Sequence, residues 1–205
     1  MIKLLSIASD PIGDSKDDAE FLDRWGSLGR ELAEMLKLRN GFYAYESALL
    51  VRPLRSEVPP LGLVEWNTPE LWKAEYDEDL DSVLFFGEDI FGCQFYIRGD
   101  QICSFDPETA IFEPMSSSLN SWASEVMSDY CLHTGFEWAH AWQDRNMSLL
   151  PGVRLLPILP FFCGGKFEVE NLQAIDDVQG MSFRALLSNN IRDLPEGAEI
   201  IFEVE

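Results

Sequence analysis

The chain has 205 residues, which is enough for one domain with a sizeable hydrophobic core. Hydrophobic residues make up 46% of it, which excludes an intrinsically disordered body. Its 15 Lys and Arg against 36 Asp and Glu give a net charge of -21, which argues against nucleic acid or anionic lipid as a partner. The same charge either keeps the protein soluble or attracts a basic partner protein, and both interpretations stay open.

Cysteine usage and hydropathy indicate the compartment. The four cysteines form no C-x-x-C pair, and a chain of this size needs no disulfides, so we expect reduced thiols. The first apolar run ends at Asp10, which is too short for the core of a signal peptide. No later run reaches the roughly 18 uncharged residues of a membrane span. We therefore expect a cytoplasmic protein that binds no membrane.

The first half of the chain is predicted to begin with a helix. Phe21 and Trp25 start a series of apolar residues at spacings of three and four, which predicts an amphipathic helix over residues 14–38. The aromatic and small apolar residues of 41–54 are compatible with a helix or with strands. A Thr-Pro-Glu start predicts a short helix over residues 71–80.

From residue 82 the pattern changes to the apolar-polar alternation of strands. Gly99-Asp100 is typical of a hairpin turn, and residues 106–109 form a second turn signal. The predicted strands cover residues 82–86, 93–98, 101–105 and 110–114.

Helical periodicity returns after the strands. Ser118 or Asn120 is expected to cap a helix, with further helix as far as Trp142. Residues 151–160 are expected to be irregular, although their apolar character indicates packed chain. The remaining predicted elements are a strand after Gly164-Gly165, a helix over 181–191 and a strand over 199–204.

This order of elements predicts an α+β fold, an antiparallel sheet with helices packed on one side. Residues 1–205 are expected to form a single domain.

The sequence offers little catalytic chemistry. No phosphate-binding glycine loop, HExxH, EF-hand loop or nucleophile-elbow motif occurs. Cys131, His133 and His140 could surround zinc, but ordinary polar or half-buried side chains are much the better explanation of them. Cys163 could act as a nucleophile, although a free cysteine is usually a small buried apolar residue. We therefore expect no catalytic residue, no metal site and no cofactor.

Two acidic stretches and two tryptophans are the candidate partner-binding residues. An acidic run of this kind is either a solvated face or a docking surface for a basic partner. Glu88-Asp89, between two glycines, is either a second acidic spot or a locally hydrogen-bonded turn. Trp66 and Trp72 flank a proline turn and are either core residues or interface anchors. The acidic run consists of Glu75, Asp77, Glu78, Asp79 and Asp81.

The segment FFGEDIFGCQFYI at 85–97, followed by FDPET at 105–109, resembles the SMI1/KNR4 family, also called the SUKH superfamily. Trp66-Asn67 is similar to the family's Trp-Asn element, and SLNSW at 118–122 fits its Ser-Leu-x-x-Trp helix. Ala110 stands where the family commonly has Gly. The resemblance covers about residues 20–130, and the segment from about 134 to 205 looks like an extension found in some bacterial members.

The resemblance implies an α+β fold without enzymatic activity. For many bacterial members it implies an immunity protein that binds and neutralises a toxin from a neighbouring cell, possible partners here being basic toxin domains. Fungal members instead regulate cell-wall synthesis. Three hypotheses therefore stand: a toxin-neutralising protein, a regulatory or scaffold interaction domain without a toxin, and an enzyme that uses the carboxylates or Cys163. The oligomeric state is not predicted.

Overall fold

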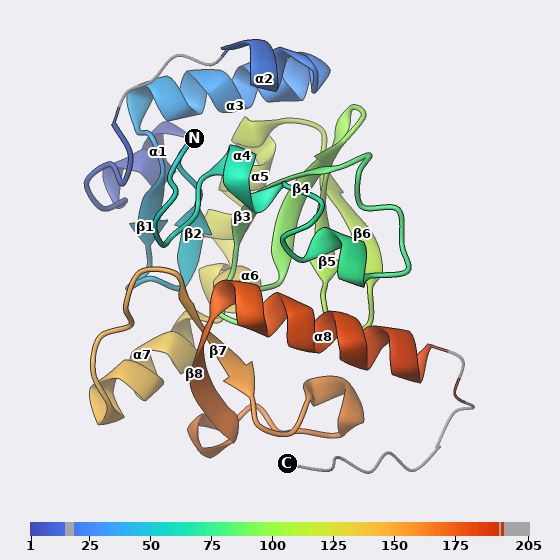
Figure 1. The fold of residues 1–205 in the computed structure, drawn as a ribbon. Coiled ribbons are helices and arrows are strands. Elements are labelled where there is room, and N and C mark those ends of the chain that lie inside the picture. The colour runs from blue at the N-terminus through green and yellow to red at the C-terminus, as the bar shows by residue number, and fades with distance from the viewer. Residues whose placement is uncertain (15–18, 193, 195–205) are drawn as a thin grey trace.

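The structure, a computed structural model, describes residues 1–14, 19–192 and 194. Six strands form one antiparallel sheet in which each strand pairs with its neighbour along the chain, from β1 to β6 (Figure 1). Two later strands form a separate antiparallel pair, β7 with β8. The bounds are β1 Phe42–Ala44, β2 Leu49–Val51, β3 Leu84–Glu88, β4 Gln94–Arg98, β5 Gln101–Asp106, β6 Ile111–Ser116, β7 Val153–Pro157 and β8 Leu172–Asp176.

Helices precede, interrupt and follow the sheet. The α-helices are α1 Ile2–Ser6, α2 Ala19–Asp23, α3 Gly26–Leu38, α4 Leu63–Trp66, α5 Leu119–Ser128, α6 Tyr130–Thr134, α7 Phe136–Arg145 and α8 Asp177–Ile191. Single 3-10 turns are η1 Lys73–Glu75, η2 Phe161–Cys163 and η3 Val169–Asn171. The predicted α+β class with an antiparallel sheet is confirmed.

Both faces of the sheet are covered, so the expectation of helices on one side is wrong. Successive strand residues point to opposite faces, and in β3 both Phe85 and Phe86 are buried. Phe86 packs with α3, and Trp122 of α5 lies edge-on to its ring at 5.0 Å. Phe85 packs with the segment from Trp66 to Val83 and with Met181 of α8. Figure 1 shows α8 passing in front of the lower ends of β5 and β6.

Two predicted helices are modified. The helix expected over 14–38 is interrupted after Asp23, and Gly26, the first residue of α3, adopts a left-handed φ of 64° there. The helix expected over 71–80 is reduced to the single turn η1. Asp79 Oδ1 accepts the Asp81 N–H at 3.1 Å, a local bond that competes with helical bonding in a segment rich in aspartate.

The remaining differences concern segments whose type was left open or that were expected to be irregular. Residues 41–54 form the β1–β2 hairpin, and residues 151–160 contain β7, although irregular structure was expected there. The strand predicted after Gly164-Gly165 begins only at Leu172, as β8. The strand predicted over 199–204 lies outside the described residues. The four predicted strands between 82 and 114, and their hairpin turn, are confirmed within two residues.

The cap of α5 yields a first prediction. The Ser118 hydroxyl accepts the Ser121 N–H at 3.1 Å, whereas Asn120 lies inside the helix. We expect Ser118→Ala to lower the free energy of unfolding by about 1 kcal/mol in urea titrations, because one end of the helix loses its acceptor. Asn120→Ala serves as the matched control and should change it by less than about 0.5 kcal/mol. Equal losses in both variants would contradict this assignment of the cap.

Candidate functional site

Buried aromatic and aliphatic residues hold the acidic run against the sheet. Trp72, Tyr76 and Leu80 recur at every fourth position and are buried in the cluster that contains Phe85. The Tyr76 hydroxyl also donates to the Pro107 carbonyl at 3.0 Å. Apart from Lys73, which is buried, the residues between these anchors are exposed or half-buried. Four carboxylates are exposed and Glu78 is half-buried, the exposed ones being Glu75, Asp77, Asp79 and Asp81.

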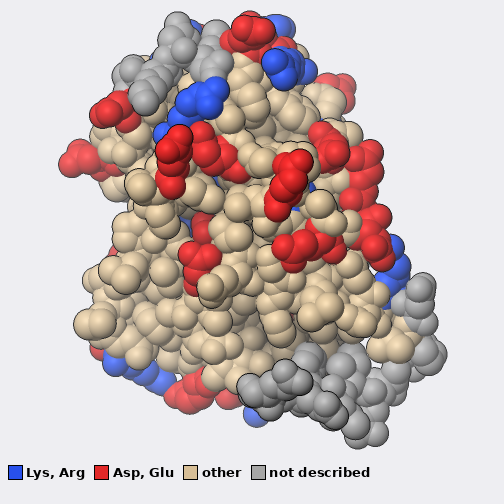
Figure 2. Space-filling view, viewed as in Figure 1, with Lys and Arg blue, Asp and Glu red and all other residues tan. Residues whose placement is uncertain are grey.

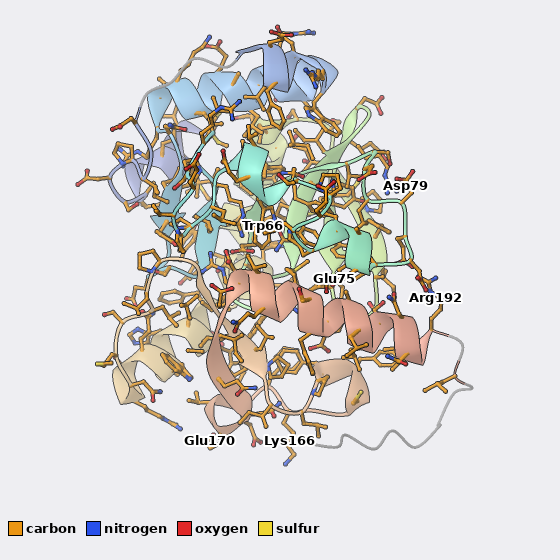
Figure 3. All side chains as sticks on the ribbon, viewed as in Figure 1. Trp66, Glu75, Asp79, Lys166, Glu170 and Arg192 are labelled. Atoms are coloured by element: carbon orange, nitrogen blue, oxygen red, sulfur yellow. The ribbon has the colours of Figure 1, made fainter. Side chains whose placement is uncertain are left out.

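Figure 2 shows carboxylates gathered over the segment above α8, where Figure 3 labels Glu75 and Asp79. Helix α8 binds part of this run. Arg192 pairs with Asp77 at 3.6 Å and also with Glu78, and the Ser182 hydroxyl donates to Glu75 Oε1 at 2.8 Å. Asp79 and Asp81 take no part in these contacts with α8, so they are the carboxylates of the run most available to a partner.

Trp66 and Trp72 are core residues, not surface anchors. Both are fully buried. Trp66 donates its indole N–H to Gln94 Oε1 at 3.0 Å, and the Arg52 guanidinium lies 3.4 Å from its ring centroid. Trp72 donates to the Trp66 carbonyl at 3.1 Å. Neither ring can contact a partner in this conformation, so their assignment as anchors is corrected.

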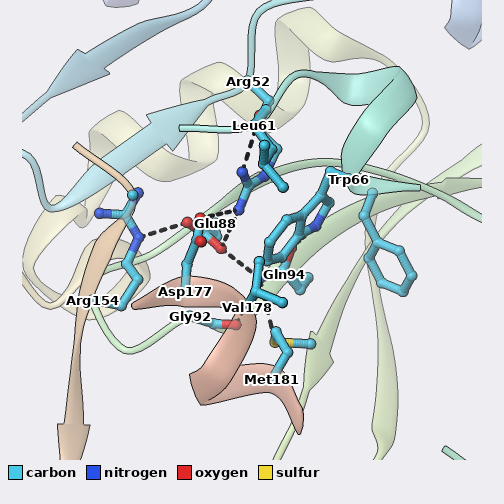
Figure 4. A network of polar contacts seen from close by, with 12 residues as sticks. Arg52, Leu61, Trp66, Glu88, Gly92, Gln94, Arg154, Asp177, Val178 and Met181 are labelled. Carbon is cyan, nitrogen blue, oxygen red and sulfur yellow. Dashed lines mark hydrogen bonds and ion pairs between the residues drawn. The ribbon is translucent and has the colours of Figure 1, made fainter. Parts of the chain in front are cut away.

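Glu88 is also not a surface residue, because it lies at the centre of a fully buried ionic network (Figure 4). One of its oxygens is 3.0 Å from Arg52 Nη2, and the other is 2.7 Å from Arg154 Nε. Arg52 Nη2 also pairs with Asp177 at 2.9 Å, and Gln94 donates to Glu88 at 2.7 Å. The network joins the end of β2 to β3, β4, β7 and α8.

The network contains two arginines and two carboxylates, so its formal charge is zero. Burial alone would raise the pKa of Glu88, but Arg52 and Arg154 outweigh it and lower that pKa to about 2. Burial raises the pKa of Asp177, because Arg52 offsets it only in part and Glu88 repels the second negative charge. Glu88 is thus the firmly ionised carboxylate that both arginines share.

Asp89 is the next residue, and it is buried rather than exposed. Its Oδ1 accepts the backbone N–H groups of Phe91 and Cys93 at 2.9 and 2.8 Å, which closes the β3–β4 turn. Burial raises the pKa of Asp89 to about 7 in spite of these bonds and of Arg184. Of the two interpretations of Glu88-Asp89, the locally hydrogen-bonded turn is correct for Asp89. The other, an exposed acidic spot, is wrong because both side chains are buried.

The cysteine and histidine candidates are dispersed. Among the described residues, no three His, Cys, Asp or Glu side chains are grouped so that they could hold a metal ion. His140 pairs with Glu46 at 2.8 Å and lies 3.6 Å from Asp144. Burial and Glu108 raise the pKa of the Cys163 thiol, which is the opposite of an activated nucleophile.

The two arginine partners of Glu88 are not among the residues predicted from the sequence. Arg52 directly follows the apolar strand β2, and Arg154 lies inside the apolar strand β7. A charged residue in an apolar run is a signal, since charges are buried only when they are paired. Their shared partner could not be read from the spacing, because Arg154 lies 66 positions from Glu88.

Comparisons with known proteins bear on the fold. No family model and no curated protein matches the chain. Among solved structures, Atu4351 from Agrobacterium tumefaciens is similar, with a TM-score of 0.59 and 12% sequence identity. The similarity covers 88% of this chain and 86% of that one, so the two share their overall α+β architecture. In the described part of the chain, no helix combines the length and apolar character needed to cross a membrane.

The network predicts a large effect on stability. Glu88→Gln should lower the free energy of unfolding by about 3–5 kcal/mol, because two buried arginines lose their common carboxylate. The measurement is denaturant unfolding at pH 7, with Glu113→Gln on the exposed side of β6 as control. Unfolding midpoints that agree for the two variants would show that the network does not stabilise the fold.

Replacing Asp89 should stabilise the fold, whereas replacing Glu88 should destabilise it. Ionised Asp89 destabilises the folded state above pH 7, because its folded pKa lies above its unfolded value near 4. Asp89→Asn should therefore raise the free energy of unfolding by about 1–3 kcal/mol at pH 8. The gain should shrink as the pH falls from 7 towards 4, because the wild-type carboxyl then becomes protonated in the folded protein. A loss of stability that is equal at every pH would contradict this account.

Proposed function

We propose that this chain is a non-enzymatic, cytoplasmic immunity protein that neutralises a basic toxin by direct binding. The observation that carries the proposal is the outward-facing acidic run, held by buried anchors on a chain of net charge -21. Such a surface repels nucleic acids and attracts a basic protein from a distance, which raises the rate of encounter. Binding at the toxin's cationic substrate site would mask that site.

The resemblance to the SMI1/KNR4 family supports this proposal. Ala110 has a left-handed φ of 54°, at the position where the family commonly has Gly. A glycine in that place is explained by the backbone, because the left-handed region is strained for other residues. The antiparallel meander from β3 to β6 also agrees with the order of elements in the resembling segment.

The direct test starts with capture of partners by the tagged chain in the cells that make it. Each captured protein is then expressed alone and together with this chain in a susceptible host. We expect one captured protein to arrest growth alone and to be harmless in the presence of this chain. Captured proteins that are harmless when expressed alone would favour the scaffold alternative.

The acidic run predicts how this partner binds. Asp79→Lys with Asp81→Lys should slow association about tenfold or more at low salt and change dissociation little, because the two carboxylates act by steering. Glu20→Lys with Asp23→Lys on α2 makes the same change of charge, and α2 packs on α3 over the opposite face of the sheet. Surface plasmon resonance would measure both. Equal slowing by the two pairs would assign steering to net charge and not to this run.

A further inference from the structure

A cavity of about 350 Å³ lies where the turns at the ends of β3 and β5 meet α6, α8 and the chain around η2. Its lining shares no residue with the acidic run or with the ionic network, although Asp89 directly follows Glu88 in the chain. Most of its lining is apolar or carboxylate. The lining residues that matter here are Asp89, Phe91, Asp106, Glu108, Phe167 and Arg184.

Aromatic rings form one side of the cavity. Phe161 and Phe167 stack with their centroids 3.9 Å apart, and Phe91 meets Phe161 edge-on at 5.3 Å. The rim is open and apolar, since Phe167 is 53% exposed and Leu132 73% exposed. Exposed aromatic surface beside a cavity is typical of a binding site.

Three carboxylates form the opposite side. The hydroxyl of Thr109 donates to Asp106 at 2.7 Å, and the Phe162 N–H donates to Glu108 at 3.0 Å, which fixes both carboxylates in the β5–β6 turn. Burial raises the pKa of Glu108, as it does that of Asp89. Burial is the main cause that raises the pKa of the Cys93 thiol in the same cavity, and the negative charges of Asp89, Asp106 and Glu108 raise it further.

Arg184 is the one arginine or lysine among the described residues that line the cavity, and each of its three nitrogens already has a partner, Nη2 lying 3.5 Å from Met181 Sδ. Its Nε donates to the Gly180 carbonyl at 3.0 Å, and Nη1 donates to the Phe91 carbonyl. Gly92 leaves room for it, because an added Cβ would lie 2.5 Å from Nη2. When Asp89 and Glu108 are ionised, three carboxylates against one guanidinium leave the cavity negative, which favours a cation over an anion.

We propose that this cavity binds a lysine or arginine side chain of a partner protein. The aromatic rings would face the aliphatic stem and the cation, and the carboxylates would pair with the charge. A bound cation would offset the free energy that ionised Asp89 costs the folded protein. Only the identity of the partner that carries this side chain rests on the proposed function. Binding of a cation in the cavity does not depend on it.

The test uses the full chain labelled with fluorophenylalanine and small probes in place of a partner. The probes are the N-acetyl amides of lysine, arginine and norleucine, the last being a neutral analogue of lysine. We expect saturable ¹⁹F shifts with millimolar affinity for the two cations, and binding of the norleucine amide about fivefold or more weaker. Asp89→Asn should weaken cation binding about fivefold or more, whereas Asp100→Asn at the β4–β5 turn should leave it unchanged.

Binding should also strengthen between pH 6 and pH 8, because a cation favours ionised Asp89 and Glu108. Arg184 and Arg154 are the positive charges that act on Asp89. Against the effect of burial, Glu88 raises the pKa of Arg154, and Cys93 stays a neutral thiol over this range. Equal affinity for the norleucine amide, unchanged affinity in Asp89→Asn or no saturable shift would each overturn the proposal. The probe experiment needs no toxin. Absence of probe binding would overturn the cation site without bearing on growth rescue, and absence of growth rescue would overturn the proposed function without bearing on probe binding.

Discussion

The arrangement of this protein depends on one carboxylate that two buried arginines share. Glu88 receives Arg52 from the end of β2 and Arg154 from β7, and Asp177 at the start of α8 completes a neutral set. Burying four charges is expensive, and the contacts compensate only when every partner is in place. The network therefore requires that β7 and α8 lie against the six-stranded sheet in one register. Through Arg154 and Asp177 it ties β7 and the start of α8 to the sheet.

Helix α8 transmits this constraint to the surface. Its first turn supplies Asp177 to the network, its middle places Arg184 behind the aromatic cavity, and its last residues lead to Arg192 beside the acidic run. Because the network is neutral, it takes up none of the chain's excess negative charge. The acidic run and the cavity are then two negative features that one basic partner could engage, the first by steering its approach and the second by holding one side chain.

The elements that could be predicted from the sequence are those with a clear local signal. The alternation from residue 82 and the Gly99-Asp100 turn gave the strands and their hairpin correctly. The acidic run was correctly placed at the surface, and its role in binding stays a prediction. Glu88 was misplaced because its burial depends on arginines 36 and 66 positions away, and no local pattern encodes such a pairing. Two-sided covering of the sheet was missed because α8 returns from the far end of the chain.

The most direct test of the central claim is native-state hydrogen exchange of the full chain. If the network unites the chain, the most protected amides of β7 and α8 exchange with the same free energy as those of β3 to β5. In Glu88→Gln all of these values should fall together. Exchange of β7 and α8 at a distinctly lower free energy in the wild-type protein would contradict the account, because the C-terminal segment would then open as a separate unit.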